Sequence, residues 1–266
     1  MKALITGASG AVGTALRAHL NARGDTIIAW DRDAVPPDDP ERVEAHVREV
    51  APDALFHLAT ASTPTGRDNE GWLVNVDWTA ALARICREIG ARFVYTGSVM
   101  AFTDDAPGPF TPHTEPDVRE GYGWEKLTGE RQALAKNPDA IVARIGWQIG
   151  HTPDGNQMLR ELHRQMNEHG VIRASRKWYT ACSFLEDTAA ALVRLAETAP
   201  GGLYLIDSNT GWTYFEIVNA LDALHDEGWR VEPDDSFVYD QRMIDPRANM
   251  PPLSDRLPAL GPPVGT

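Results

Sequence analysis

The chain has 266 residues, 42% of them hydrophobic, and a formal net charge of −13. A chain of this size can bury one sizeable core, as a single domain or as a domain with a small lobe. The acidic balance argues against nucleic-acid binding, which requires a basic surface. No stretch approaches the roughly 20 apolar residues of a membrane span. Met1 and Lys2 lead directly into a strand rather than a secretory signal, so we expect a cytoplasmic protein with no membrane partner.

A glycine-rich turn follows the first apolar strand. The segment ITGASGAVG lies between a strand at residues 3–5 and a helix predicted over 11–23, with Gly7, Gly10 and Gly13 in G-x-x-G-x-x-G spacing. Glycines let a pyrophosphate approach the backbone, and the N–H groups at the start of the helix then face its negative charge. In this position the pattern indicates a dinucleotide site rather than a turn without a ligand.

Strand-like and helix-like stretches then alternate along the chain. We predict strands over residues 26–31, 53–58, 91–96, 140–145 and 203–207. We predict helices over residues 40–50, 69–89, 121–135 and 184–197. This alternation predicts an α/β fold of the Rossmann type, a doubly wound parallel sheet with helices on both faces.

Two later stretches break the rhythm. Residues 146–183 and 208–266 carry polar loops, isolated helices and many prolines, and we interpret them as a small substrate-binding lobe built from insertions. Residues 1–145 plus 184–207 would then form the dinucleotide-binding domain. The proline-rich tail over 250–266 is predicted to be partly disordered.

Few residues suggest a disulfide or a metal site. Cys86 and Cys182 are too few for a disulfide framework and neither lies in a C-x-x-C pair, so we expect reduced core thiols. The histidines lack a metal-ligand spacing with carboxylate support, and we expect no metal.

Asp31 ends the second predicted strand, 18 residues after Gly13. A carboxylate there can accept hydrogen bonds from the adenosine ribose and would repel a 2′-phosphate, which favours NAD(H). Arg32 follows at once and could pair with that phosphate, so NADP(H) stays possible. The alternative is a turn aspartate that contacts no ligand.

Tyr122 and Lys126 lie four residues apart on a predicted helix and therefore share a face. A free tyrosine has a pKa near 10, and we expect the neighbouring ammonium group to lower it and so to ease proton transfer. Ser98, at the end of the fourth predicted strand, could donate to a substrate carbonyl beside Tyr122. Each pattern alone also fits a solvated helix face or a simple turn.

Together these residues resemble the extended short-chain dehydrogenase/reductases, and most closely their dTDP-4-dehydrorhamnose reductase branch. ITGASGAVG is similar to the cofactor turn, FVYTGSVMAF to the active-site strand and YGWEK to the catalytic helix. RIGWQIG and LYLIDSNTGWTYFEIVNAL resemble later segments of the branch. The resemblance spans most of the chain.

The resemblance implies roles for individual residues. The cofactor diphosphate would contact Gly10, Ala11 and Val12, and the adenosine ribose Asp31. The nicotinamide side would contact Thr60, Ala61, Ser62 and Thr96. The catalytic set would be Ser98, Tyr122 and Lys126, with Lys126 also bonding the nicotinamide ribose, Asn75 supporting the site, and Val99 and Trp147 on the substrate side.

The substrate half departs from the branch. Val99 stands where the rhamnose-pathway reductases typically carry an aspartate, and STPTGRDNE replaces a charged cluster. Trp147 could stack on a sugar or fill a hydrophobic gap. The basic stretch Arg173–Trp178 could hold a phosphate or form a solvated loop.

We therefore predict an NAD(P)-dependent oxidoreductase, with a 4-keto sugar nucleotide as the leading substrate class by resemblance. One alternative is an epimerase or dehydratase that returns the hydride. Another is a non-catalytic dinucleotide-binding regulatory protein, since fold does not fix function. In this superfamily the helices here predicted over 69–89 and 121–135 often form a four-helix interface, which suggests a homodimer.

Overall fold

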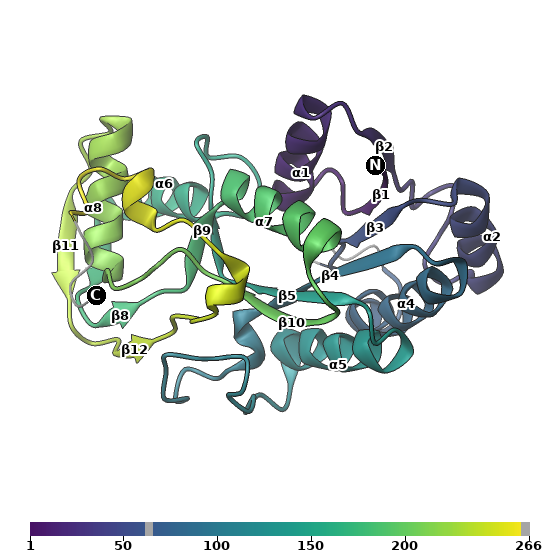
Figure 1. Ribbon diagram of the computed structural model, residues 1–266. Helices are drawn as coiled ribbons and strands as arrows, with labels where there is room; N and C mark the ends of the chain where they lie inside the picture. Colours follow the sequence, from purple (N-terminus) through teal and green to yellow (C-terminus); the bar gives the residue numbers. More distant parts are fainter. Residues whose placement is uncertain (62–65, 262–266) are drawn as a thin grey trace.

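The computed structural model describes residues 1–61 and 66–261, and a parallel sheet of six strands runs through it (Figure 1). The strand order is β10-β5-β4-β3-β1-β2. The sheet consists of β1 (Lys2–Thr6), β2 (Thr26–Ala29), β3 (Ala54–His57), β4 (Arg92–Ser98), β5 (Ile141–Ile145) and β10 (Gly202–Ile206). The order reverses at β1 and β3, and the carboxyl ends of strands at such a switch point are where α/β sheets bind ligands.

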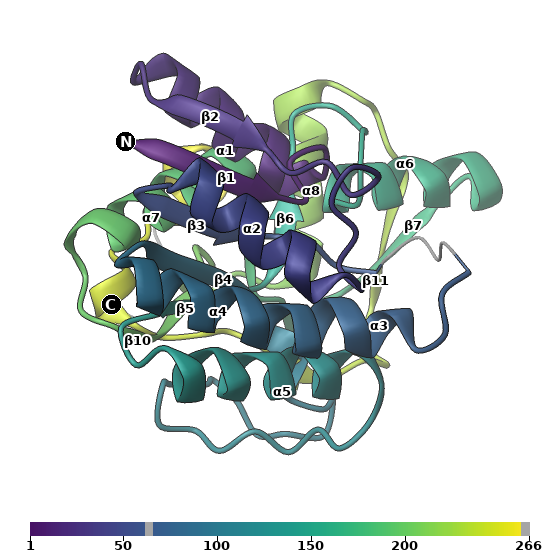
Figure 2. The ribbon, with the colours of Figure 1, turned by 90° about the vertical axis from the view of Figure 1, so that its right-hand side faces the viewer.

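Helices cover both faces of the sheet (Figures 1 and 2). One face carries α1 (Ala11–Ala22) and α7 (Leu185–Thr198), and the other carries α2 (Pro40–Val50), α4 (Trp78–Ile89) and α5 (Gly121–Lys136). Figure 2 looks onto the second layer, in which α4 lies between α2 and α5. The predicted Rossmann-type α/β architecture is confirmed. Homodimerisation through α4 and α5 stays a prediction.

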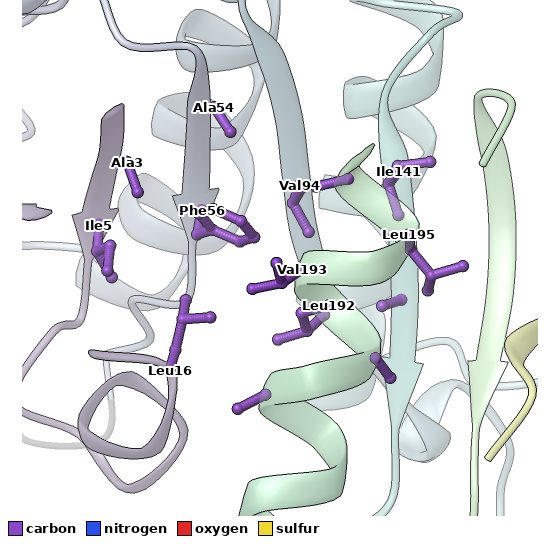
Figure 3. Packing of buried hydrophobic residues seen from close by; sticks show 14 of the residues in the cluster. Ala3, Ile5, Leu16, Ala54, Phe56, Val94, Ile141, Leu192, Val193 and Leu195 are labelled. Atoms are coloured by element: carbon purple, nitrogen blue, oxygen red, sulfur yellow. The ribbon is translucent and has the colours of Figure 1, made fainter. Parts of the chain in front are cut away.

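Side chains of the buried strands point alternately to the two faces of the sheet, and each face has its own apolar core. Ile5, Phe56 and Val94 lie on neighbouring strands and belong to the cluster that Leu16 of α1 and Leu192 of α7 complete (Figure 3). Their chain neighbours Leu4, Leu55 and Phe93 face the opposite layer of helices. Successive side chains of a strand point to opposite faces, so a sheet buried on both sides has nearly continuous apolar strands.

The predicted long helix over 69–89 is interrupted by a π turn. It consists of α3 (Glu70–Trp72), the π turn Leu73–Asp77 and α4. Within the π turn the carbonyl of Asn75 presses against α5, where a Cβ added to Gly129 would lie 2.0 Å from that oxygen. Such turns are frequent at functional sites. Helical periodicity alone does not reveal this one, because the apolar pattern continues through it.

The lobe has its own core beside the sheet. Three two-stranded sheets pair β6 (Trp147–Ile149) with β9 (Cys182–Phe184), β7 (Ile172–Ser175) with β11 (Val231–Asp234), and β8 (Trp178–Tyr179) with β12 (Tyr239–Asp240). They pack with the helices α6 (Met158–His169) and α8 (Tyr214–His225). We propose the predicted ranges as the domain division. Residues 245–248 nevertheless return to the main sheet, where Asp245 accepts a hydrogen bond from the N–H of Leu205.

The prediction of disorder is wrong for residues 250–261 of the tail. Leu253, Leu257 and Leu260 are buried in the lobe core. Prolines excluded a long helix, but these leucines recur every three or four residues and anchor short turns. Cys86 and Cys182 are buried free thiols, as predicted. Among the described residues, no helix is long and apolar enough to cross a membrane.

We predict that Leu257→Ala lowers the free energy of unfolding by about 2–4 kcal/mol, because it empties a fully buried site. The free energy of unfolding would be measured by urea denaturation for this variant and for a control, Leu224→Ala, whose leucine is 42% exposed. Equal losses in the two variants would show that the tail does not contribute to the core.

Candidate active site

The glycine turn joins the end of β1 to the start of α1. Gly7 has φ of +67°, and a Cβ there would lie 2.8 Å from the backbone nitrogen of Ala59 on the loop after β3. A Cβ on Gly13 would lie 2.2 Å from the Gly7 carbonyl oxygen. Gly10 precedes α1, and no side chain caps the helix there, which leaves its first N–H groups for a ligand. The turn therefore fits a diphosphate.

A buried hydrogen-bond pair fixes the ends of β1 and β3 beside this turn. The Thr6 hydroxyl lies 2.7 Å from Nδ1 of His57 and accepts hydrogen bonds from the N–H groups of Leu58 and Ala59. Burial lowers the pKa of His57 to about 3, so the ring is neutral. His57 is therefore a structural residue that holds the loop leading to Thr60.

A cavity of about 610 Å³ opens between the glycine turn, the carboxyl ends of the strands and the lobe. It brings together most of the predicted site residues: Gly7, Gly10, Ala11, Val12, Gly13, Thr60, Thr96, Ser98, Val99, Tyr122, Lys126 and Trp147. Segments distant in sequence thus converge where the sequence pattern predicted a dinucleotide and substrate site. Their individual roles stay proposals.

Three of the described residues that were predicted to bind the cofactor do not line this cavity, and a fourth cannot be placed. Asp31 and Arg32 lie beyond the end of β2, Ala61 lies on the loop after β3, and Ser62 falls outside the described residues. One carboxylate oxygen of Asp31 accepts hydrogen bonds from the N–H groups at positions 33 and 34, which is the turn role considered above. The second oxygen has no partner in the described part of the chain and is available to a ribose.

Ser98 is the last residue of β4, two residues beyond the predicted end of that strand. Its Oγ accepts a hydrogen bond of 3.1 Å from the N–H of Met100 and so caps a short 3₁₀ turn. A serine hydroxyl has one hydrogen to donate besides the lone pairs that accept. Ser98 is therefore held in place and can still donate to a carbonyl oxygen in the cavity.

The pKa of the Tyr122 phenol is raised, whereas the sequence predicted that it would be lowered. Desolvation raises the pKa, the carboxylate of Glu125 adds to the rise, and a hydrogen bond with Thr60 opposes it. The predicted lowering by Lys126 is not found, because the lysine has a pKa of about 7 and has lost its proton before the phenol ionises. Tyr122 is 41% exposed and faces the cavity, so its phenol stays protonated and accessible at neutral pH.

Lys126 is buried, with only 2% of its surface exposed. Its ammonium nitrogen lies 4.2 Å from the centre of the Tyr95 ring. Burial lowers its pKa to about 7, against the opposing charges of Glu130 and Glu125. A lysine with such a pKa gains its proton readily when an anion approaches.

The charge of the cavity opposes that of the whole protein. Its described lining contains two cations, Lys126 and Arg160, and neither an acidic residue nor a histidine, although the chain carries a net charge of −13. The lining therefore favours an anionic ligand. It also lacks a carboxylate or imidazole that could remove a proton from a carbon atom of the substrate.

Sequence reasoning missed four polar residues that the lobe contributes. Asn156, Arg160, Thr180 and Gln241 line the cavity, although no motif marks them. Beyond Trp147 lies a second cavity of about 430 Å³. Trp147, Trp178 and Tyr214 form its aromatic wall, with ring centres 4.7–6.2 Å apart.

The basic stretch at 173–178 is divided between two roles. Arg176 pairs with both oxygens of Asp235, and Lys177 approaches the same carboxylate, so these two cations lie on a solvated turn. Arg173 and Trp178 line the second cavity. Among residues 1–61 and 66–261 no group of three or more His, Cys, Asp or Glu side chains could hold a metal ion.

Comparison with known proteins agrees with this geometry. Residues 1–247 match the family described as RmlD substrate binding domain. The chain belongs to the RmlD substrate-binding domain family. The prediction of an extended short-chain dehydrogenase/reductase is thereby confirmed.

Two curated relatives and one solved structure illustrate the likeness. The chain is 28% identical over 216 residues to dTDP-4-dehydrorhamnose reductase of Mycobacterium tuberculosis, covering 78% of this chain and 70% of the relative. It is 28% identical over 255 residues to the enzyme of the same name from Streptomyces griseus, covering 92% and 83%. The fold matches dTDP-4-dehydrorhamnose reductase from Bacillus anthracis, solved in complex with NADP, with a TM-score of 0.81, 21% identity and 96% of each chain covered.

The buried Lys126 predicts a pH-dependent stability. Its pKa is about 7 in the folded protein against an ordinary value of 10.5, so the unfolded chain binds more protons between these pH values. The free energy of unfolding contributed by this group therefore rises with pH across that window. We expect the free energy of unfolding of the wild type, measured relative to that of Lys126→Met in urea denaturation, to rise from pH 7 to pH 10. A difference that does not change with pH would contradict the buried position of the ammonium group.

Proposed function

We propose that the protein is an NAD(P)-dependent reductase that converts a carbonyl of a sugar nucleotide to an alcohol. The observation that carries the proposal is the cavity that joins a glycine turn to Ser98, Tyr122 and Lys126 with no acidic residue in its described lining. Membership of the RmlD substrate-binding domain family and likeness to relatives named dTDP-4-dehydrorhamnose reductase support the same substrate class.

The residues present fit the two halves of a nicotinamide dinucleotide. The uncapped start of α1 and the close-packed glycines would hold the diphosphate. Lys126 would bond the nicotinamide ribose at the other end of the cavity. A bound reduced nicotinamide would supply hydride to the carbonyl carbon.

Tyr122 and Ser98 would act on the carbonyl oxygen. The raised pKa of Tyr122 keeps its phenol protonated, so it can donate that proton as negative charge develops on the oxygen. Ser98, fixed by its bond from Met100, would stabilise the same charge by donating its hydroxyl hydrogen. An anionic cofactor would help Lys126 to keep its proton, and in that charged form Lys126 would stabilise the phenolate left behind.

The substrate would extend from this point into the lobe. Trp147 lines both the main cavity and the second one, where the aromatic wall suits a base. Arg173 in the second cavity lies among the carboxylates Glu161 and Asp234, so the phosphates are left to the main cavity. The second cavity, which does not include the glycine turn, gives the base of a nucleotide a place apart from the cofactor. The departure at Val99 would then change contacts to the sugar rather than to the nucleotide.

The alternatives receive less support from the site. A dehydratase, or an epimerase that removes a proton from carbon, usually needs an added acid or base, and the described lining offers no carboxylate or imidazole near Ser98. A regulatory protein would not need the tyrosine, the serine and the buried lysine in one cavity.

Tyr122→Phe is predicted to lower kcat for reduction of a 4-keto sugar nucleotide by at least about 100-fold, the usual scale of lost acid catalysis. Cofactor affinity, measured by fluorescence titration, should not change. Tyr204→Phe, in a strand on the far side of the sheet, serves as the matched control. Full turnover by the Tyr122 variant would refute the assignment.

For the cofactor we propose a preference for NAD(H), because the free carboxylate oxygen of Asp31 would bond a ribose and repel a 2′-phosphate. Asp31→Asn retains the turn hydrogen bonds, and we predict that it shifts the ratio of affinities toward NADP(H) by about tenfold or more. Asp33→Asn, two residues away on the same turn, controls for the change in surface charge. The same ratio in all three proteins would show that Asp31 does not select the cofactor.

A further inference from the structure

Residues 150–157 form a strap that connects β6 to α6 and lies over the glycine turn. Gln157 is buried and closes the strap, because its side-chain oxygen accepts hydrogen bonds from the N–H groups of Gly150 and Leu159. At the tip, a Cβ on Gly155 would lie 3.4 Å from the Cβ of Ala11, the first residue of α1. The strap is therefore the wall opposite the N–H groups proposed to hold a diphosphate.

Arg160 lies in the first turn of α6 and reaches back to this strap. Its guanidinium donates one hydrogen bond, of 3.2 Å, to the carbonyl of Gly155. In the described part of the chain it makes no ion pair, whereas Arg164, one helical turn later, pairs with Glu161 and Glu168. An arginine without a carboxylate partner, in a protein this acidic, has its charge available to a ligand.

We propose that Arg160 binds a diphosphate in the main cavity, facing the start of α1 across it. Lys126 is the other cation of the described lining, and it is buried beside Tyr95 at the catalytic end. The phosphates are therefore left to the N–H groups of α1 and to Arg160. Binding exchanges the Gly155 carbonyl for a phosphate oxygen, which forms a stronger, charge-assisted bond.

Two ligands of the proposed reaction carry this group, and the inference rests on that proposed function. The diphosphate belongs either to the cofactor or to the nucleotide of the substrate. ADP-ribose carries the first without the nicotinamide, and dTDP carries the second without the sugar. Neither probe requires turnover.

The test is calorimetric titration of both probes into wild type, Arg160→Gln and Arg164→Gln. The two variants lose the same charge from the same helix, and Arg164 does not line the main cavity. We expect Arg160→Gln to weaken binding of at least one probe about tenfold and to reduce the salt dependence of that binding. Arg164→Gln should bind both probes as wild type does.

The possible results distinguish the role of Arg160 from the proposed reductase function. A loss confined to ADP-ribose assigns Arg160 to the cofactor, and a loss confined to dTDP assigns it to the substrate. Equal affinities in all three proteins overturn the role of Arg160 and leave the proposed reductase standing. Failure of the wild-type protein to bind either probe overturns both.

Discussion

The burial of the Lys126 ammonium group is the constraint on which the site depends. The ring of Tyr95 lies 4.2 Å from it, and the charges of Glu130 and Glu125 offset part of the cost of desolvation. Glu130 is itself held by a buried bidentate pair with Arg144, whose two bonds are each 2.8 Å. Because that carboxylate is already neutralised, the lysine stays poorly compensated until an anion enters the cavity. The site is therefore prepared for a ligand with negative charge.

The main cavity also differs from the rest of the protein in its lack of acidic side chains. A protein with a net charge of −13 keeps acidic side chains out of the described lining of its main cavity. Ser98 and Tyr122 can assist charge that develops on an oxygen, but no neighbouring carboxylate or imidazole can take a proton from carbon. This division agrees with simple carbonyl reduction and disfavours dehydration and any epimerisation that removes a proton from carbon. Fold alone makes no such distinction, because all three reactions occur on related frameworks.

The sequence predicted those features that are local or repeated. The glycine spacing requires a close backbone approach, and Tyr122 and Lys126 share a face by helical geometry. Arg160 could not be found in this way, because its relation to Ala11 arises only when the strap folds over the turn. The direction of the Tyr122 pKa shift was also missed, since it depends on how far folding desolvates the phenol and the neighbouring lysine. The roles of Ser98, Tyr122 and Lys126 remain proposals that only chemistry can test.

The most direct measurement follows the label from a reduced cofactor carrying deuterium at the transferable position of nicotinamide C4. The protein would be incubated with this cofactor and a 4-keto sugar nucleotide, and the products analysed by mass spectrometry. Our account predicts one deuterium on the new carbinol carbon for each cofactor oxidised. Regeneration of the reduced cofactor, or enzyme-dependent uptake of solvent hydrogen at a neighbouring ring carbon, would contradict it.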